Sequence, residues 1–215
     1  DIWQRGTSFT VTPNGQYTAD RWFARRQGGI TGLTISRVPG SQARYALRLQ
    51  RNPGDTSTNL GWMAQLIETS NTIPLRNKKI TISFRARRGA NFGSANNQIR
   101  LLITGGTAVD GTFTNSIGDI AGSTTIIDQS IVLTTDWQDI SFTSAGPVGA
   151  GINLISYHIR TAGYSGTAGA NDWFEIELVQ LCVGDVPLPF QPRSVADELA
   201  LCQRYYRRWG GSISG

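Results

Sequence analysis

The stretch KKITISFRARR, residues 78–88, decides the fold class of this chain. Every second position in it is apolar, and lysine, threonine, serine and arginine fill the positions between; the apolar set is Ile80, Ile82, Phe84 and Ala86. Side chains of a β-strand point to opposite faces in turn. This period of two therefore predicts a strand with one buried and one solvated face.

Three further segments repeat this alternation: RYALRLQR (44–51), WQDISFT (137–143) and DWFEIELVQLCV (172–183). In the last segment the pattern assigns Phe174, Ile176 and Leu178 to one face, and Glu175, Glu177 and Val179 to the other. Less regular strands are expected at 7–12, 61–69, 97–104, 124–134 and 152–162. Turns rich in Gly, Asn and Asp separate these strands. Eight or nine such strands predict an all-β, antiparallel two-sheet jelly-roll sandwich with one short C-terminal helix.

Length and composition predict a single folded domain. At 215 residues, with 25 glycines, six tryptophans and 39% hydrophobic residues, the chain can bury a core as one sandwich. We expect the sandwich to span residues 1–186, and residues 187–215 to form a proline-rich connector and an amphipathic helix. No apolar run approaches the roughly 18 residues that span a bilayer, so membrane insertion is not expected. The chain begins at Asp1 without an initiator Met, which indicates a processed product or part of a longer protein.

Charge is distributed unevenly along the chain. Residues 1–108 hold 15 Lys and Arg against 4 Asp and Glu, whereas residues 109–215 hold 5 against 11. Because both halves contribute to the same sheets, the simplest interpretation is compensation within a subunit or between neighbouring subunits. Nucleic-acid binding is the alternative for clusters such as RARR (85–88). However, Arg85 and Arg87 alternate with apolar residues like the solvated face of a strand, so no nucleic-acid partner is expected.

The segment after the last expected strand has a different pattern. GDVPLPFQPRS (184–194) carries three prolines in six residues and predicts a stiff, extended connector. Ser194 is suited to cap a helix, with Asp197 three positions later. Apolar residues then recur at spacings of four, three and four, which predicts an amphipathic helix with one apolar stripe: Val195, Leu199, Cys202 and Tyr206.

Aromatic and basic residues crowd the end of this helix. Tyrosine, tryptophan and arginine dominate the energetics of protein interfaces. The helix is therefore expected to cover the base of its own sandwich, to contact sister subunits, or both; the residues concerned are Arg204, Tyr205, Tyr206, Arg207, Arg208 and Trp209.

The chain has two cysteines, Cys182 in the last expected strand and Cys202 in the helix. Two cysteines are too few for a metal site, which needs more ligands at short spacing. They form either a disulfide that links the strand to the helix or two buried free thiols, and the sequence leaves both alternatives open.

The chain offers little catalytic chemistry. Its single histidine, His158, lies in NLISYHIR (153–160) and is expected on the exposed face of a strand. No G-x-S-x-G elbow, phosphate-binding loop or dinucleotide fingerprint accompanies it. Carboxylate pairs for glycoside hydrolysis are conceivable, but surface acids that balance the arginine-rich half explain them more simply; the pairs are Asp136 with Asp139 and Glu175 with Glu177. We expect no enzyme activity and no catalytic residues.

Exposed aromatic rings are the other route to function, because sugars stack their apolar C–H faces on such rings. The candidates for an exposed sugar-stacking platform are Trp62, Tyr164 and Trp137, although tryptophan side chains are usually largely buried. A calcium ion held by Glu177 or Asp172 together with backbone carbonyls is a further hypothesis, which no Asp-rich loop supports. No other cofactor is expected.

Two groups of motifs resemble known families. LTTDWQDISFT (133–143) followed by DWFEIELVQLCVG (172–184) resembles the paired strands of carbohydrate-binding-module jelly rolls. DIWQRGTSFT (1–10), YTADRWFA (17–24) and VQLCVGDVPLPFQPRSVADELALCQRYYRRW (179–209) resemble tailed-phage virion proteins of the tail-fibre, minor structural or receptor-binding type. This second similarity runs from residue 1 to about 209 and implies a jelly-roll head domain, often trimeric, on the outside of a virion.

The residues and the resemblance together predict a non-enzymatic virion structural protein, a fibre or receptor-binding head domain that adheres to a glycan of the host surface. We expect it to act as a homotrimer on the virion surface, with other virion proteins as further partners. Two alternatives remain: a capsid decoration protein without a ligand, and a carbohydrate-binding module of a glycoside hydrolase. A third, a glycan-cleaving tail spike, requires a carboxylate pair in a groove.

Overall fold

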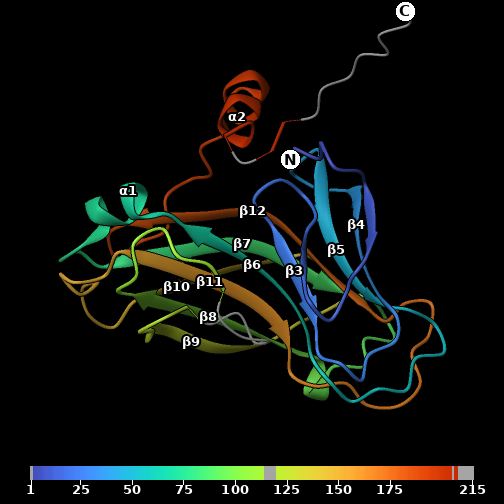
Figure 1. Cartoon of the computed structure of the whole chain (residues 1–215). Helices are drawn as coiled ribbons and strands as arrows, with labels where there is room; N and C mark the ends of the chain where they lie inside the picture. Colours follow the sequence, from blue (N-terminus) through green and yellow to red (C-terminus); the bar gives the residue numbers. More distant parts are fainter. Residues whose placement is uncertain (1, 114–119, 205, 208–215) are drawn as a thin grey trace, which may run out of the picture.

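The computed structural model describes residues 2–113, 120–204 and 206–207. In this part of the chain twelve β-strands form two six-stranded antiparallel sheets that face each other (Figure 1). Sheet A has the strand order β1-β4-β5-β12-β7-β10, and sheet B has the order β2-β3-β6-β11-β8-β9. The predicted all-β, two-sheet jelly-roll sandwich is thereby confirmed.

The strands of sheet A are Ser8–Thr10 (β1), Leu33–Pro39 (β4), Tyr45–Arg51 (β5), Ile80–Arg88 (β7), Gln138–Thr143 (β10) and Trp173–Val183 (β12). Those of sheet B are Gln16–Tyr17 (β2), Phe23–Arg26 (β3), Gly61–Ile67 (β6), Gln98–Gly106 (β8), Thr124–Val132 (β9) and Leu154–Thr161 (β11). The helices are α1 (Thr69–Thr72), α2 (Val195–Cys202) and two 3₁₀ turns, Ile73–Leu75 and Ala95–Asn97.

Three of these strands were not predicted from the sequence. Strands β2 and β3 are two and four residues long, which is too short to give a periodic signal. Strand β4 begins with the expected alternation at Leu33 and Ile35, but Arg37 occupies the next inward position and breaks the pattern. The number of strands therefore exceeds the eight or nine expected.

The hydrophobic core lies between the two sheets. The inward residues predicted for β7 are all buried in it: Ile80, Ile82, Phe84 and Ala86. Sheet B contributes Ile155, Tyr157 and Ile159 of β11 to the same core. Full burial of a large apolar side chain stabilises the fold by roughly 1.5–3 kcal/mol. These alternating positions hold the two sheets together.

Strand β12 contains an irregularity that the sequence pattern did not predict. Leu178 has a backbone φ of 53°, and the register with β7 shifts between Glu177 and Gln180. A β-bulge of this kind adds one residue to a strand, and residues beyond it change faces. Val179 consequently packs against the core in place of Leu178, which corrects the predicted assignment of both residues.

The bulge also separates β12 from β5. The two strands pair only over residues 173–176 of β12, whereas pairing with β7 continues to Val183. Sheet A is therefore split on one side of β12 beyond the bulge, and the chain leaves this part of the strand toward α2 (Figure 1).

Helix α2 follows the proline-rich connector, as predicted. The hydroxyl of Ser194 accepts a hydrogen bond from the Asp197 N–H at 3.1 Å and donates one to the Asp197 carboxylate at 2.7 Å, which confirms the predicted cap. The apolar stripe is only partly confirmed. Cys202 is buried and Leu199 is half-buried, but Val195 is 72% exposed because the first turn of the helix borders an open groove.

Helix α2 and the residues after it contact their own sandwich. The contacts are an ion pair between Glu198 and Arg21, an ion pair between Arg204 and Glu68 at 3.0 Å, and the Arg5 guanidinium 3.9 Å from the ring centre of Tyr206. Arg207 is exposed, and three other residues of the predicted interface lie outside the described residues: Tyr205, Arg208 and Trp209. No helix among the described residues has the length and hydropathy needed to cross a membrane.

Both cysteines are free thiols, so the disulfide alternative is wrong. The Cys182 thiol donates to the carbonyl of Thr81 in sheet A at 3.5 Å. Cys202 is buried at the end of α2, and this burial raises the pKa of its thiol. The two cysteines thus lie on different elements, Cys182 in β12 of sheet A and Cys202 in the last turn of α2.

The buried Arg51 joins several loops at one end of the sandwich. Its guanidinium lies 3.2 Å from the Asp172 carboxylate and donates to the carbonyls of Asp55 at 3.0 Å and Gly166 at 2.6 Å. Burial raises the pKa of Asp55, but hydrogen bonds from Ser57 and from residues 31–32 lower it more, and the net pKa is below its ordinary value. Arg51 thus neutralises two buried carboxylates that belong to different loops.

Replacing Arg51 by methionine should lower the free energy of unfolding by about 3–5 kcal/mol, because Asp55 and Asp172 would remain buried without their cation. Urea unfolding followed by tryptophan fluorescence measures this. Arg100→Met is the matched control. Its ion pair with Asp128 is 38% and 37% exposed, so its loss should cost under about 1 kcal/mol. Equal losses in the two variants would contradict the role given to Arg51.

Candidate functional site

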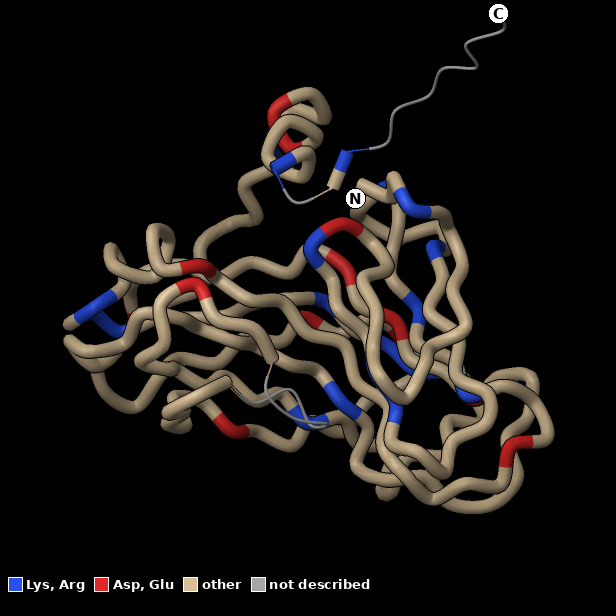
Figure 2. The backbone as a smooth tube through the Cα atoms, in the orientation of Figure 1, with Lys and Arg blue, Asp and Glu red and all other residues tan. Residues whose placement is uncertain are grey.

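The outer face of sheet A, the side away from the core, carries a row of charged residues. Strand β12 lies between β5 and β7, and the register places Glu175 beside Arg48 on one side and Arg87 on the other. Arg48 donates to the Glu175 carboxylate at 2.8 Å and Arg87 at 2.7 Å. The carboxylate itself has no exposed surface. Charges from the two halves of the sequence therefore compensate within one chain, and Figure 2 shows acidic and basic positions interspersed over the sandwich.

A second row runs alongside the first. Glu177 lies beside Arg85 of β7 at 3.0 Å, and Arg85 also pairs with Asp139 of β10 at 2.9 Å. The Glu177 carboxylate accepts a further hydrogen bond from the Ser41 N–H at 2.8 Å, in the turn between β4 and β5. Burial raises the pKa of Glu177, but hydrogen bonds from residues 41–43 lower it more, so that its pKa lies below the ordinary value. Glu177 thus anchors this turn to the sheet.

Two tryptophans flank the first row. Trp173 begins β12, Trp137 immediately precedes β10, and both are half-buried. The Arg48 guanidinium lies 4.2 Å from the ring centre of Trp173, while that of Arg87 lies 4.8 Å from Trp137 and 5.6 Å from Trp173. Such cation–π contacts hold the rings in place. We call Arg48, Arg87, Trp137, Trp173 and Glu175 the arginine–tryptophan face.

The sequence identified one of these two rings. Trp137 was predicted as a platform residue and does lie at the surface of sheet A. Trp173 was missed, although the alternation in DWFEIEL places it on the same face as Glu175. Arg48 was missed for a different reason: periodicity along one strand does not say which strand lies beside it.

The other two predicted platform residues are buried, so the prediction of an exposed platform at those positions is wrong. Trp62 is 0% exposed because Phe23 and Phe113 pack against its ring, with 5.7 and 5.8 Å between ring centres. Tyr164 is 4% exposed, and its ring centre lies 4.7 Å from the guanidinium of Arg51. Each ring is covered by side chains from distant parts of the sequence.

His158 is also buried, contrary to the predicted surface position. The alternation itself is correct, because Ile155, Tyr157 and Ile159 of β11 face the core and the histidine faces away from it. The outer face of sheet B is nevertheless covered by aromatic residues, and the Trp62 ring centre lies 6.2 Å from that of His158. A strand position that points away from the core is therefore not solvated here.

The two carboxylates considered for calcium are bound by arginine instead. Glu177 pairs with Arg85 at 3.0 Å and Asp172 with Arg51 at 3.2 Å. A guanidinium already supplies the positive charge at each position. The described part of the chain also contains no group of three histidine, cysteine or acidic side chains that could hold a metal ion. The hypothesis of a calcium ion held by Glu177 or Asp172 is therefore wrong at both residues.

The pair Glu175 and Glu177 lacks the properties of a glycosidase pair. The general acid of such enzymes has a raised pKa, whereas the pKa of Glu177 is lowered. Both carboxylates are fully covered by their arginine partners and leave no space for a sugar. Asp139, of the other pair, is 82% exposed and binds Arg85. Glu175 and Glu177 therefore pair with arginines of sheet A.

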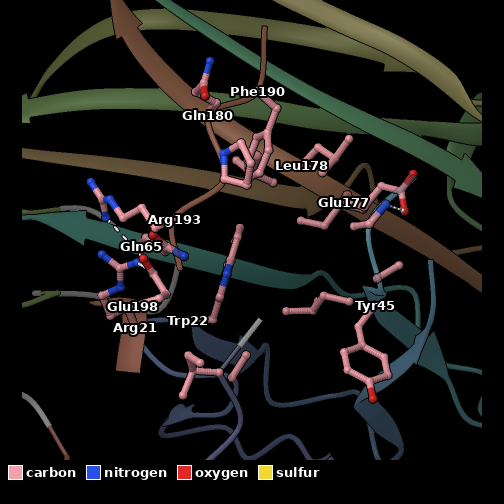
Figure 3. Close-up of a pocket in the computed structure, with 18 of the residues that line it drawn as sticks. Arg21, Trp22, Tyr45, Gln65, Glu177, Leu178, Gln180, Phe190, Arg193 and Glu198 are labelled. Atoms are coloured by element: carbon pink, nitrogen blue, oxygen red, sulfur yellow. Dashed lines mark hydrogen bonds and ion pairs between the residues drawn. The ribbon is translucent and has the colours of Figure 1, made fainter. Parts of the chain in front are cut away.

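A groove of about 600 Å³ lies where sheet A is split, beneath the connector and α2 (Figure 3). Apolar, aromatic, amide and charged side chains line it, among them Trp22, Tyr45, Gln65, Leu178, Phe190, Arg21, Arg193 and Glu198. Gln180 ties the connector to β12, because its side-chain amide donates to the Leu188 carbonyl at 3.0 Å and accepts from the Gln191 N–H at 2.8 Å. The connector is thus fixed to β12 and contributes to the wall of the groove.

Comparison with known proteins adds information on the fold. No protein-family model and no curated protein matches this chain. A solved structure described as "Structural basis for the promiscuous specificity of the carbohydrate-binding modules from the beta-sandwich super family" matches with a TM-score of 0.50 and 8% identity, over 80% of this chain and 63% of that one. At this identity the match shows a shared sandwich fold alone.

Two further solved structures have slightly lower scores. One, described as "CBM4 structure and function", has a TM-score of 0.49 and 21% identity, and the match covers 77% of this chain and 88% of that one. The other is the enzymatically active domain of bacteriophage CBA120 tailspike protein 4, with a TM-score of 0.47 and 14% identity over 76% of this chain. This chain spans only 19% of the length of that tailspike chain.

Replacing Glu177 by glutamine should destabilise the protein most at neutral pH. A carboxylate with a lowered folded-state pKa adds stability that is fully present above its unfolded pKa of about 4.3 and is lost as the pH falls through the folded pKa. The difference in unfolding free energy between the native protein and Glu177→Gln, measured by urea at pH 7 and at about pH 3, should therefore shrink in acid. Asp139→Asn, at an 82% exposed position, should change little. A difference for Glu177→Gln that does not vary with pH would contradict this assignment.

Proposed function

We propose that this chain is a non-catalytic glycan-binding module and that the arginine–tryptophan face is its ligand surface. The observation that supports this is the position of Trp137 and Trp173, two half-buried rings that flank a row of arginines on the outer face of sheet A. Sugars stack their C–H faces on such rings, while neighbouring N–H donors bind their hydroxyl groups. A surface that combines both kinds of contact suits a carbohydrate better than an apolar ligand.

The rings are also held in position before a ligand arrives. Arg87 contacts both tryptophans and Arg48 contacts Trp173, while Glu175 fixes both guanidinium groups from below. A preorganised site loses little conformational entropy on binding, which favours affinity for a weak ligand such as a sugar. Binding without chemistry also agrees with the environment of the nearby acids, because Glu177 is held ionised and bound to arginine.

We further propose that the module is displayed on the surface of a tailed-phage virion, where it adheres to a glycan of the host. The motifs that resemble tailed-phage virion proteins support this placement, and the sandwich fold is compatible with it. A capsid decoration protein without a ligand, and a carbohydrate-binding module of a glycoside hydrolase, are the competing assignments. The neighbouring genes distinguish these assignments. Virion genes favour the glycan-adhering virion protein or the capsid decoration protein, and a catalytic domain in the same reading frame favours the carbohydrate-binding module.

The connector and α2 support a role in self-association. Five of the ten exposed large hydrophobic residues found among the described residues fall in these two segments, and a sixth, Val183, ends β12; the five are Val186, Leu188, Phe190, Val195 and Leu201. Clustered apolar exposure of this kind marks interaction surfaces. A closed trimer would cover these residues and present three ligand faces together, which multiplies weak binding into avidity.

Trp137→Ala and Trp173→Ala should each weaken glycan binding about tenfold, the equivalent of roughly 1.4 kcal/mol, because each removes one stacking surface. A glycan array identifies the ligand, and calorimetric titration with that glycan measures the affinity. Tyr17→Ala, which removes a 45% exposed ring of β2 in sheet B, is the control and should bind normally. Loss of binding in Tyr17→Ala, with normal binding in both tryptophan variants, would contradict the assignment of the ligand to the arginine–tryptophan face.

The native protein should have a mass near three times 23.4 kDa by light scattering. Replacing Leu188 and Phe190 together by serine should reduce it toward the monomer mass, because both apolar side chains would be buried in the trimer. Val132→Ser, at an exposed valine of β9, should leave the mass unchanged. A native protein that stays monomeric at high concentration would rule out this role for the connector.

A further inference from the structure

The first row of the arginine–tryptophan face carries an excess of positive charge. Two guanidinium groups, those of Arg48 and Arg87, share the single carboxylate of Glu175. In the second row the balance is reversed, because Arg85 contacts two carboxylates, those of Glu177 and Asp139. The uncompensated positive charge is therefore located in the row between the two tryptophans.

Arg87 is the arginine best placed to act on a ligand. Its Nε donates to Glu175 at 2.7 Å, and no described residue accepts a hydrogen bond from its two terminal nitrogens, Nη1 and Nη2. Its side chain is 32% exposed, so a ligand can reach these nitrogens. A guanidinium has five N–H donors, and most of those of Arg87 remain available beside the Trp137 ring.

We propose that the arginine–tryptophan face selects acidic glycans and binds a sugar carboxylate, as in uronic or sialic acids, through Arg87 while the sugar stacks on Trp137. This inference rests on the proposed function and adds the chemical class of the ligand. The planar guanidinium matches a carboxylate in a bidentate pair. The Trp137 ring centre lies 4.8 Å from this guanidinium, which places a stacking surface next to the anion site.

The charges around the site favour isolated carboxylates over a polyanion. A nucleic acid carries phosphates at close intervals and needs a series of cations to match them. Here the neighbouring row presents Asp139, which is 82% exposed and repels a continuous line of negative charge. One anionic group on an otherwise neutral sugar meets the positive row without approaching the acidic one.

Matched pairs of probes test this with the full chain. The acidic probes are trigalacturonate and sialyllactose, and their neutral partners are the methyl ester of trigalacturonate and lactose. We expect at least one acidic probe to bind at least tenfold more tightly than its partner. Arg87→Gln should remove that preference and retain the weaker binding of the neutral partner, whereas Trp137→Ala should weaken both. Arg44→Gln, which removes an exposed arginine immediately before β5, is the charge-matched control and should keep the preference.

The outcomes separate this inference from the proposed function. Equal binding of acidic and neutral partners, or an unchanged preference in Arg87→Gln, overturns the selection of acidic glycans and leaves glycan binding intact. No binding to these probes or to any glycan on an array overturns both. Tighter binding of an oligothymidylate than of either acidic sugar identifies a phosphate site and also overturns the inference. If the melting temperature of Arg87→Gln is close to that of the native protein, misfolding is excluded as the cause of a loss of binding preference.

Discussion

The need to pair buried carboxylates determines the arrangement of sheet A. Glu175 has no exposed surface, and an ionised carboxylate is tolerated in such a place only with a cation beside it. Its two cations come from different strands, Arg48 from β5 and Arg87 from β7. A slip of one residue would turn Glu175 toward the core and separate these charges. The pairing therefore fixes the register of β5, β12 and β7 and, with it, the position of Trp173 at the start of β12.

Alternation along single strands predicted the sandwich, the inward face of β7 and the cap at Ser194, because each depends on neighbouring residues only. The bulge at Leu178 was not predictable in this way. A bulge adds one residue without changing the apolar composition of the strand, so the sequence reads as a continued alternation. Its effect is nevertheless large, because it moves Val179 to the core and ends the pairing of β12 with β5.

Alternation along single strands also fails to predict which residues of the candidate site are exposed. Periodicity correctly placed Trp137 and His158 on outward positions, yet one is at the surface and the other is fully buried. The difference lies in what covers each sheet. Trp62 and Phe113 cover the outer face of sheet B around His158, whereas arginines that remain partly exposed line the outer face of sheet A. Whether an outward strand position is exposed or buried depends on contacts between segments that are far apart in the sequence. The alternation along one strand does not predict these contacts.

Strand β12 links the two surfaces to which functions are assigned. Its first half carries Trp173 and Glu175 of the arginine–tryptophan face, and beyond the bulge Gln180 binds the connector that leads to α2. Because one rigid strand bears both, the orientation of the ligand face relative to the connector is set by the sheet and not by a flexible linker. Avidity requires that linked sites engage their ligands simultaneously. In the proposed trimer, a connector fixed on β12 would meet that requirement, because it would hold the proposed ligand faces of all copies in defined directions.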